Sequence, residues 1–428
     1  MKYSIDGLFL LCVFVLVSTF VVFNVTKKPL ILDSVEYQYA AENVLNVNTL
    51  YAGNIDNEVD YRLFSKRTIG YPLFLLFQQN NPLFVHLSQL LLVVFNVILS
   101  FHILRNEKAN KSSVLFFFCM IILSPVVFFH SQFVLADLLL ATIITTIVAV
   151  FTDTTIENNK KHTLLAILWA FGLAIKPALL PSLLAIPFLL IWFYVAKRKL
   201  FLSYLLPIVC WALLSWLNYN NIKQFELSSI STINVAHYNA KLTIAKKHGI
   251  DSAQSFTEND IFKIPRSIDA YSAYKANLNR VGTTTILSNF STYLKVHFLG
   301  SVKMILDPGR FEIYTFFNEP TSNKSLTELL FAGNWEELKT ELVKNKLLVV
   351  LFVFLLIVNL VKLPFFVVSL NRPNEAAVFK LVIIAYFIGL TGPIGAARFM
   401  LPAMFVYLTL VSIGLSKTLK FFQKSSKG

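Results

Sequence analysis

The sequence predicts an all-α integral membrane protein with about ten transmembrane helices and an extracytoplasmic cap. Of the 428 residues, 56% are hydrophobic and only 14% are charged, a composition unlike that of a soluble globular chain. About ten apolar runs approach or reach the ~20 residues that a helix needs to cross a hydrocarbon core of about 30 Å. Two long polar stretches separate these runs and are predicted to form the cap.

The net charge of +14 comes mostly from Lys and Arg in short clusters between the apolar runs. This pattern is typical of attraction to anionic lipid headgroups and argues against nucleic-acid binding. Cys12, Cys119 and Cys210 all lie inside apolar runs. We therefore expect small core residues and no disulfide framework.

Seven spans are predicted before the long polar region and three after it. The first run lacks a small-residue cleavage site, so we expect a retained helix rather than a cleaved signal. The predicted spans are 7–25, 82–104, 113–130, 133–151, 163–175, 178–196, 201–217, 347–370, 377–392 and 399–415.

One further segment, 286–306, is long enough to span but carries Lys295, His297 and Lys303. Charges at a bilayer centre cost about 2.5–3.5 kcal/mol each, so an interfacial helix is predicted there. Ten spans with the N-terminus inside place the short basic loops and the Lys-bearing tail in the cytoplasm. An eleventh span would move that tail outside.

The predicted organisation is one membrane domain with a cap, because no Gly/Ser linker or internal repeat is visible. Its parts are an N-terminal module of seven spans (1–217) with the first outer loop (26–81), an extracytoplasmic region (218–346), and the last spans with a basic tail (347–428).

Four ionisable residues fall at the predicted outer ends of spans. Asp33 follows span 1, Asp137 lies near the start of span 4, Lys176 ends span 5 and Arg398 begins span 10. Acids and bases at one depth indicate a site for a phosphorylated ligand and a proton acceptor. The alternatives are that Asp33 caps a helix in solvent, that Asp137 is a paired structural acid, and that the two cations extend to lipid phosphates.

Five more residues are candidates for the same site. Arg67 is a third cation for a phosphate, and a sugar or acceptor could be bound by Glu36, Tyr37, Tyr71 and His130. The alternatives are that Glu36 lies on the wet face of a helix, that the tyrosines belong to an interfacial aromatic belt, and that His130 is a capped interfacial histidine.

Several stretches, taken in order, resemble GT-C glycosyltransferases, in particular the bacterial members related to protein O-mannosyltransferases and lipid A aminoarabinose transferases. "DSVEYQYAAENV" and "KRTIGYPLFLLF" are similar to the first outer loop of that family. "SQFVLADLLLATI" is similar to its second acidic motif, "GLAIKPALLPSLLAIP" to its Arg/Lys-Pro step, and "AARFMLPAMFVYLTLVSIGL" to its Arg-x-x-x-Pro start of a late span.

This resemblance implies an inverting glycosyltransferase in a bacterial inner membrane, with its active site facing the periplasm. The implied donor is a polyprenyl-phosphate-linked sugar, and the acceptor is a hydroxyl of a glycan, lipid or protein. In this interpretation Asp33 is the general base and Asp137 orients the acceptor or Asp33. Lys176, Arg398 and Arg67 would then bind the donor phosphate.

The sequence also departs from the family. Ser34 follows Asp33 where many relatives have Asp-Glu, and Asp137 has no Asp-x-Asp nearby, so a divalent metal is left open. An oligosaccharide polymerase or ligase is an alternative, with key arginines in a late loop among Arg266, Arg280 and Arg310. A transporter is another, and it would be expected to show paired halves with matching broken helices.

Overall fold

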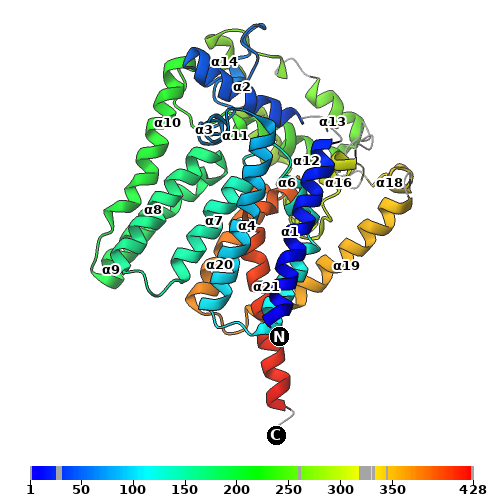
Figure 1. Ribbon diagram of the computed structural model, residues 1–428. Coiled ribbons are helices and arrows are strands. Elements are labelled where there is room, and N and C mark those ends of the chain that lie inside the picture. The colour runs from blue at the N-terminus through cyan, green and yellow to red at the C-terminus, as the bar shows by residue number, and fades with distance from the viewer. Residues whose placement is uncertain are drawn as a thin grey trace.

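The computed structural model describes residues 2–25, 31–258, 262–317, 329, 333–343 and 346–425. Every regular element in these ranges is a helix, which confirms the predicted all-α class. Long helices run side by side as a bundle, and shorter helices gather at one end of it (Figure 1). The chain starts and finishes at the opposite end, through α1 (Lys2–Val25) and α21 (Ala397–Ser425).

Within the described ranges, five helical segments are long and apolar enough to cross a membrane, and three shorter apolar helices accompany them. The long segments are Pro82–Asn106, Pro177–Ala196, Leu202–Ile222, Leu348–Ser369 and Ala397–Gln423; the shorter ones are Phe9–Val25, Lys111–Ile122 and Asp137–Thr152. With α8 (Asn158–Ile175) and α20 (Glu375–Thr391), these segments fall on the ten predicted runs. Ten crossings remain a prediction.

The predicted span 113–130 is divided into α5 (Lys111–Ile122) and α6 (Pro125–His130). Pro125 has no backbone N–H and disfavours a helical conformation at Ser124, which has φ −118° and ψ 79°. The predicted single helix is therefore wrong at this point.

Other predicted boundaries also shift. The run predicted from 133 becomes α-helical only at Asp137, and prolines turn the start of the run predicted from 178 into a 3₁₀ helix. The observed elements are α4 (Pro82–Asn106), α7 (Asp137–Thr152), η2 (Pro177–Leu184), α9 (Ala185–Lys197), η3 (Leu202–Leu205), α10 (Leu206–Ile222) and α19 (Lys346–Ser369).

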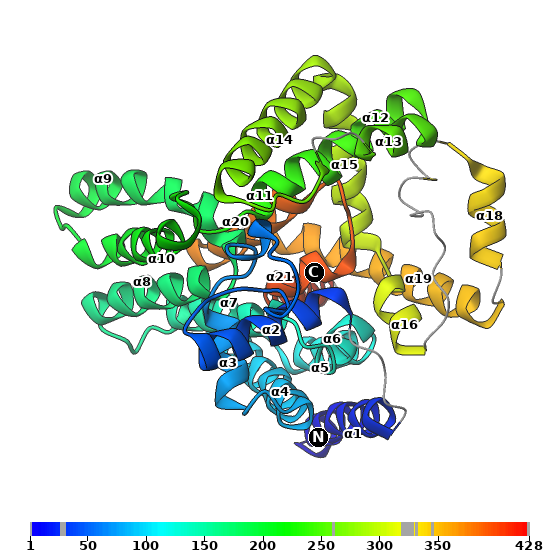
Figure 2. The ribbon, with the colours of Figure 1, turned by 90° about the horizontal axis from the view of Figure 1, so that it is seen from above.

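The last helix, α21, forms the centre of the bundle. In its most apolar stretch 78% of the residues are buried inside the protein, whereas in the segment Pro177–Ala196 only 17% are. Seen from above, α8, α9, α10 and α19 project outward from α21 (Figure 2). A residue at the start of α21 is therefore surrounded by other helices.

The two polar segments predicted to form the cap are helical in their described parts, and they pack against each other. Tyr61 and Phe64 of the first outer loop contact a small core formed by Ile222, Ala236, Phe262, Tyr271, Tyr274 and Leu278. The helices of the two polar segments are α2 (Leu32–Val47), η1 (Tyr61–Leu63), α3 (Gly70–Phe77), α11 (Ile230–Ile233), η4 (Asn234–Ala240), α12 (Lys241–His248), α13 (Ile250–Thr257), α14 (Ile268–Ser288), α15 (Phe290–Leu306), α16 (Arg310–Phe317) and α18 (Trp335–Val343). Within the predicted regions, 26–30, 259–261, 318–328, 330–332 and 344–345 lie outside the described residues.

The predicted interfacial helix 286–306 corresponds mainly to α15, which begins after a break at Asn289. It is not among the segments that are long and apolar enough to span. Its placement at the interface remains a prediction.

Candidate functional site

Four ionisable residues lie at helix ends on the side of the bundle that carries the short helices. Asp33 is in the first turn of α2, and Asp137 is the first residue of α7. Lys176 directly follows α8, which ends there because Pro177 disfavours helical conformation in the residue before it. Arg398 is the second residue of α21.

These four side chains form one continuous cluster. The Lys176 Nζ donates to Asp137 Oδ1 at 2.5 Å, and Arg398 Nε donates to Asp137 Oδ2 at 3.3 Å. Arg398 Nη2 lies 2.7 Å from Asp33 Oδ2. The side chains of Lys176 and Arg398 are only 17% and 16% exposed, so most of their surface lies against other parts of the protein.

The cluster continues through Arg67. Its Nη2 donates to Asp33 Oδ1 and to Glu36 Oε2, both at 2.6 Å, and Lys66 Nζ donates to Glu36 Oε1 at 2.6 Å. Glu36 is buried, so its placement on a wet helix face is wrong. Among the described residues, the cluster thus holds four cations (Lys66, Arg67, Lys176 and Arg398) and three carboxylates (Asp33, Glu36 and Asp137), a surplus of one positive charge.

The two aspartates differ in access. The Asp33 side chain is 29% exposed, whereas that of Asp137 is 1% exposed. Burial alone would raise the pKa of Asp33, but the guanidinium groups of Arg67 and Arg398 outweigh it and lower the pKa to about 2. Asp33 is therefore ionised, and it is the more accessible acid of the pair.

Tyr238 lies beside the cluster although nothing in the sequence singled it out. It belongs to η4, a π-helical segment, and is 45% exposed. Burial raises its pKa first, and the carboxylate of Asp33 raises it further. π-Helical segments occur frequently at functional sites, and Tyr238 is a partly exposed side chain near Asp33.

The two candidate tyrosines support the cluster from inside. The Arg67 guanidinium lies 4.7 Å from the ring centroid of Tyr37, whose ring is 4.8 Å from that of Tyr71. The Tyr71 hydroxyl donates to Gln89 Oε1 at 3.0 Å. Both rings are buried, so neither offers an open face to a sugar; they orient Arg67 instead.

His130 does not face an open cavity. Its Nε2 lies 3.1 Å from Glu312 Oε1 of α16, and both side chains are fully buried. His130 is therefore a buried histidine that is bonded to a buried acid. This pair attaches α16 to the end of α6, and Glu312 could not have been assigned to His130 from the sequence, because 182 residues separate them.

A close backbone contact fixes the loop that precedes Arg398. A Cβ added at Gly300 of α15 would overlap the carbonyl oxygen of Gly392, and Gly395 has φ +57°. Gly300 therefore allows the two backbones to approach closely, and Gly395 allows the left-handed backbone conformation. The loop that precedes Arg398 packs directly against the backbone of α15.

Asp307, which follows α15, strengthens this attachment. Its Oδ2 accepts a hydrogen bond from the backbone N–H of Ala397 at 2.8 Å, and its Oδ1 accepts from that of Gly309 at 3.1 Å. A carboxylate at the start of a helix satisfies an otherwise unpaired N–H and interacts favourably with the helix dipole. Asp307 thereby holds the first residue of α21, next to Arg398.

The cluster is a poor metal site. In the described ranges, no three His, Cys, Asp or Glu side chains are grouped to hold a metal ion. Arg398 stands between Asp33 and Asp137, so a divalent cation would have to displace a guanidinium that already neutralises both acids. The donor set does not fit such an ion, and we derive no step through one.

A comparison of the chain with protein-family models and with curated proteins gives no match. Interpretation of the cluster therefore depends on its geometry and chemistry.

Proposed function

We propose that the chain is an inverting glycosyltransferase that moves a sugar from a polyprenyl-phosphate donor to an acceptor hydroxyl at the extracytoplasmic face of a bacterial inner membrane. The observation that carries the proposal is Arg398 held between Asp33 and Asp137, in a cluster with one surplus positive charge. This arrangement offers an accessible carboxylate beside cations that can receive a phosphate.

The depth of the cluster suits such a donor. Its lipid tail would lie in the bilayer, while its sugar-phosphate ester would lie at the interface. Asp137, Lys176 and Arg398 lie at the ends of helices α7, α8 and α21, where the bundle meets the short helices. A donor whose ester lies at this level would meet the cluster there.

The proposed reaction is a single displacement. The acceptor oxygen attacks the anomeric carbon while the bond from that carbon to the phosphate oxygen breaks, and Asp33 takes the hydroxyl proton. The electron pair of the broken bond remains on the lipid phosphate. Arg398, Lys176 and Arg67 stabilise this developing charge more strongly than the bound ester, which lowers the barrier.

The ion pairs of Asp33 make its basicity dependent on the donor. With Arg67 and Arg398 bound to it, its pKa of about 2 is too low for a general base near neutral pH. A donor phosphate that takes over guanidinium hydrogen bonds removes positive charge from Asp33 and raises that pKa. Proton abstraction would then begin only after the donor has bound.

The arginines considered for a polymerase or ligase do not contact the cluster in the described structure. Arg266 pairs with Glu58 at 3.0 Å, the Arg310 guanidinium lies 4.5 Å from the ring centroid of Tyr314, and Arg280 is exposed. None of these contacts involves the cluster, so no observation favours that function over sugar transfer from a lipid phosphate.

The test is transfer of radiolabelled sugar by the purified full chain from polyprenyl-phosphate sugars to envelope fractions. Asp33→Asn should abolish transfer, because the amide cannot accept the proton. The matched control is Glu42→Gln on the same helix; Glu42 is exposed and accepts a hydrogen bond from Asn80 Nδ2, which glutamine can also accept. Transfer that survives Asp33→Asn would show that Asp33 is not the base. If neither the wild type nor Glu42→Gln transfers sugar, the proposed function is rejected.

A further inference from the structure

Lys362 of α19 is a buried cation inside an apolar helix. It is 2% exposed, and its Nζ donates to Asn359 Oδ1 at 2.9 Å and to Ser124 Oγ at 3.1 Å. Within the described part of the chain it forms no ion pair. Lys380, which is equally buried, differs because its Nζ donates to both oxygens of Glu107 at 2.7 Å.

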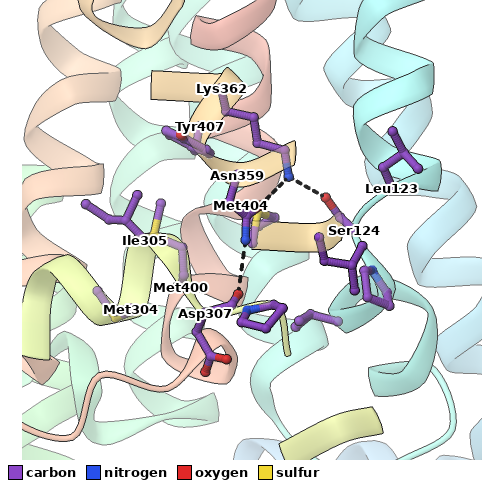
Figure 3. A pocket seen from close by; sticks show the side chains of 14 residues that line it. Leu123, Ser124, Met304, Ile305, Asp307, Asn359, Lys362, Met400, Met404 and Tyr407 are labelled. Carbon is purple, nitrogen blue, oxygen red and sulfur yellow. Dashed lines mark hydrogen bonds between the residues drawn. The ribbon is translucent and has the colours of Figure 1, made fainter. Parts of the chain in front are cut away.

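A small cavity lies beside Lys362, where the break between α5 and α6 meets α15, α19 and α21 (Figure 3). Its volume is about 20 Å³, and three methionines, Met304, Met400 and Met404, form much of its apolar wall. A cavity needs about 10–15 Å³ to hold one water molecule. The space therefore accommodates a single species of water size or slightly larger.

Most polar groups around the cavity already have partners. The Ser124 hydroxyl donates to the Met120 carbonyl oxygen at 2.7 Å. The Asn359 amide donates to the carbonyl oxygens of Leu306 and Asp307 at 3.1 and 3.2 Å. The Asp307 carboxylate points away from Lys362, as Figure 3 shows, and accepts from Ala397 instead.

Two donors have no acceptor in the part of the chain that the structure describes. A lysine ammonium has three hydrogens, and two of those of Lys362 are used. The hydroxyl of Tyr407, which lines the same cavity and is 5% exposed, has no hydrogen-bond partner among the described residues. The cavity therefore combines an uncompensated positive charge with free donors.

We propose that this cavity binds a small monovalent anion of the size of chloride. A water molecule could accept both hydrogen bonds, but it would bring two hydrogens of its own into a wall of methionine and leucine. An anion brings only acceptor capacity and balances the ammonium, which relieves the large cost of an unpaired charge at membrane depth. The bound ion would join α19 to the break between α5 and α6.

Halide-dependent stability tests this proposal independently of any transfer activity. The full chain in detergent is unfolded thermally in sodium chloride, sodium bromide and sodium gluconate at equal ionic strength. We expect Tm to rise saturably with chloride or bromide but not with gluconate. Lys362→Met should abolish the rise, and Tyr407→Phe should move its midpoint to a higher halide concentration.

The matched control is the double variant Lys380→Met/Glu107→Gln, which removes the other buried lysine together with its partner and should keep the halide response. A wild-type Tm that is equal in chloride and gluconate would overturn the proposal, as would an unchanged response in Lys362→Met. If Lys362→Met does not fold, bromide-soaked wild-type crystals decide: an anomalous peak beside Lys362 Nζ supports the anion site, and a water there refutes it.

Discussion

Arg398 Nη2 lies 2.7 Å from Asp33 Oδ2, so the last helix of the bundle, α21, is bonded directly to α2. The same guanidinium reaches Asp137 through its Nε. A planar fork can serve two carboxylates at once, which the single ammonium of lysine cannot do with the same geometry. The identity of residue 398 therefore determines whether the two aspartates remain connected.

Arg398→Lys should lower kcat/KM for sugar transfer at least about 100-fold, the usual effect of removing one donor to a developing charge. The matched control is Arg266→Lys, because Arg266 also pairs with an acid, Glu58, but at an exposed site. Initial rates over a range of donor concentrations measure the effect. Equal kcat/KM in the two variants would show that the bridge has no catalytic role.

Lys176→Met should destabilise the fold by about 3–5 kcal/mol, the typical cost of removing one partner of a buried ion pair. The variant leaves the 1%-exposed carboxylate of Asp137 with only the longer bond to Arg398. Adding Asp137→Asn should recover much of the stability without restoring transfer. Unfolding of the single and double variants in detergent measures this coupling, and additive effects would contradict it.

Stability should also depend on the ionisation of Asp33. Its folded-state pKa of about 2 lies below the ordinary value of 3.8, so its contribution is fully present above pH ~4 and is lost as pH falls towards 2. Asp33→Asn should therefore flatten the fall in Tm between pH 4 and 2, while Glu42→Gln should not. Parallel curves for wild type and Asp33→Asn would show that the ion pairs contribute no net stability.

The sequence contained most of the information about where the cluster lies. Asp137, Lys176 and Arg398 were identifiable because charge is costly inside apolar runs, and alternation of the spans placed their ends on one side. The break before Pro125 could also have been expected from proline chemistry, since proline disfavours helix in the residue that precedes it.

The remaining contacts depend on long-range packing that has no local signal. Burial of Glu36 follows from Lys66 and Arg67 folding back onto α2, and a helix with acids in its first turn looks equally suited to solvent. The approach of Gly300 to Gly392 could not be predicted from the sequence for a related reason. A glycine contributes to no side-chain pattern, and only the folded structure shows that a Cβ at Gly300 would overlap the Gly392 backbone.

Gly300→Ala tests whether α15 positions Arg398. The added methyl would overlap the Gly392 carbonyl oxygen, so the loop before α21 must move, at a cost of about 1–3 kcal/mol for overpacking. A displacement near 1 Å at Arg398 would lower transfer by about 100-fold.

The matched control is Gly389→Ala in α20, where an added Cβ meets nothing within 4 Å and replacement of a helical glycine should stabilise by about 0.5–1 kcal/mol. Thermal unfolding and transfer rates are measured for both variants. If Gly300→Ala unfolds and transfers like Gly389→Ala, the contact between α15 and this loop does not set the position of Arg398.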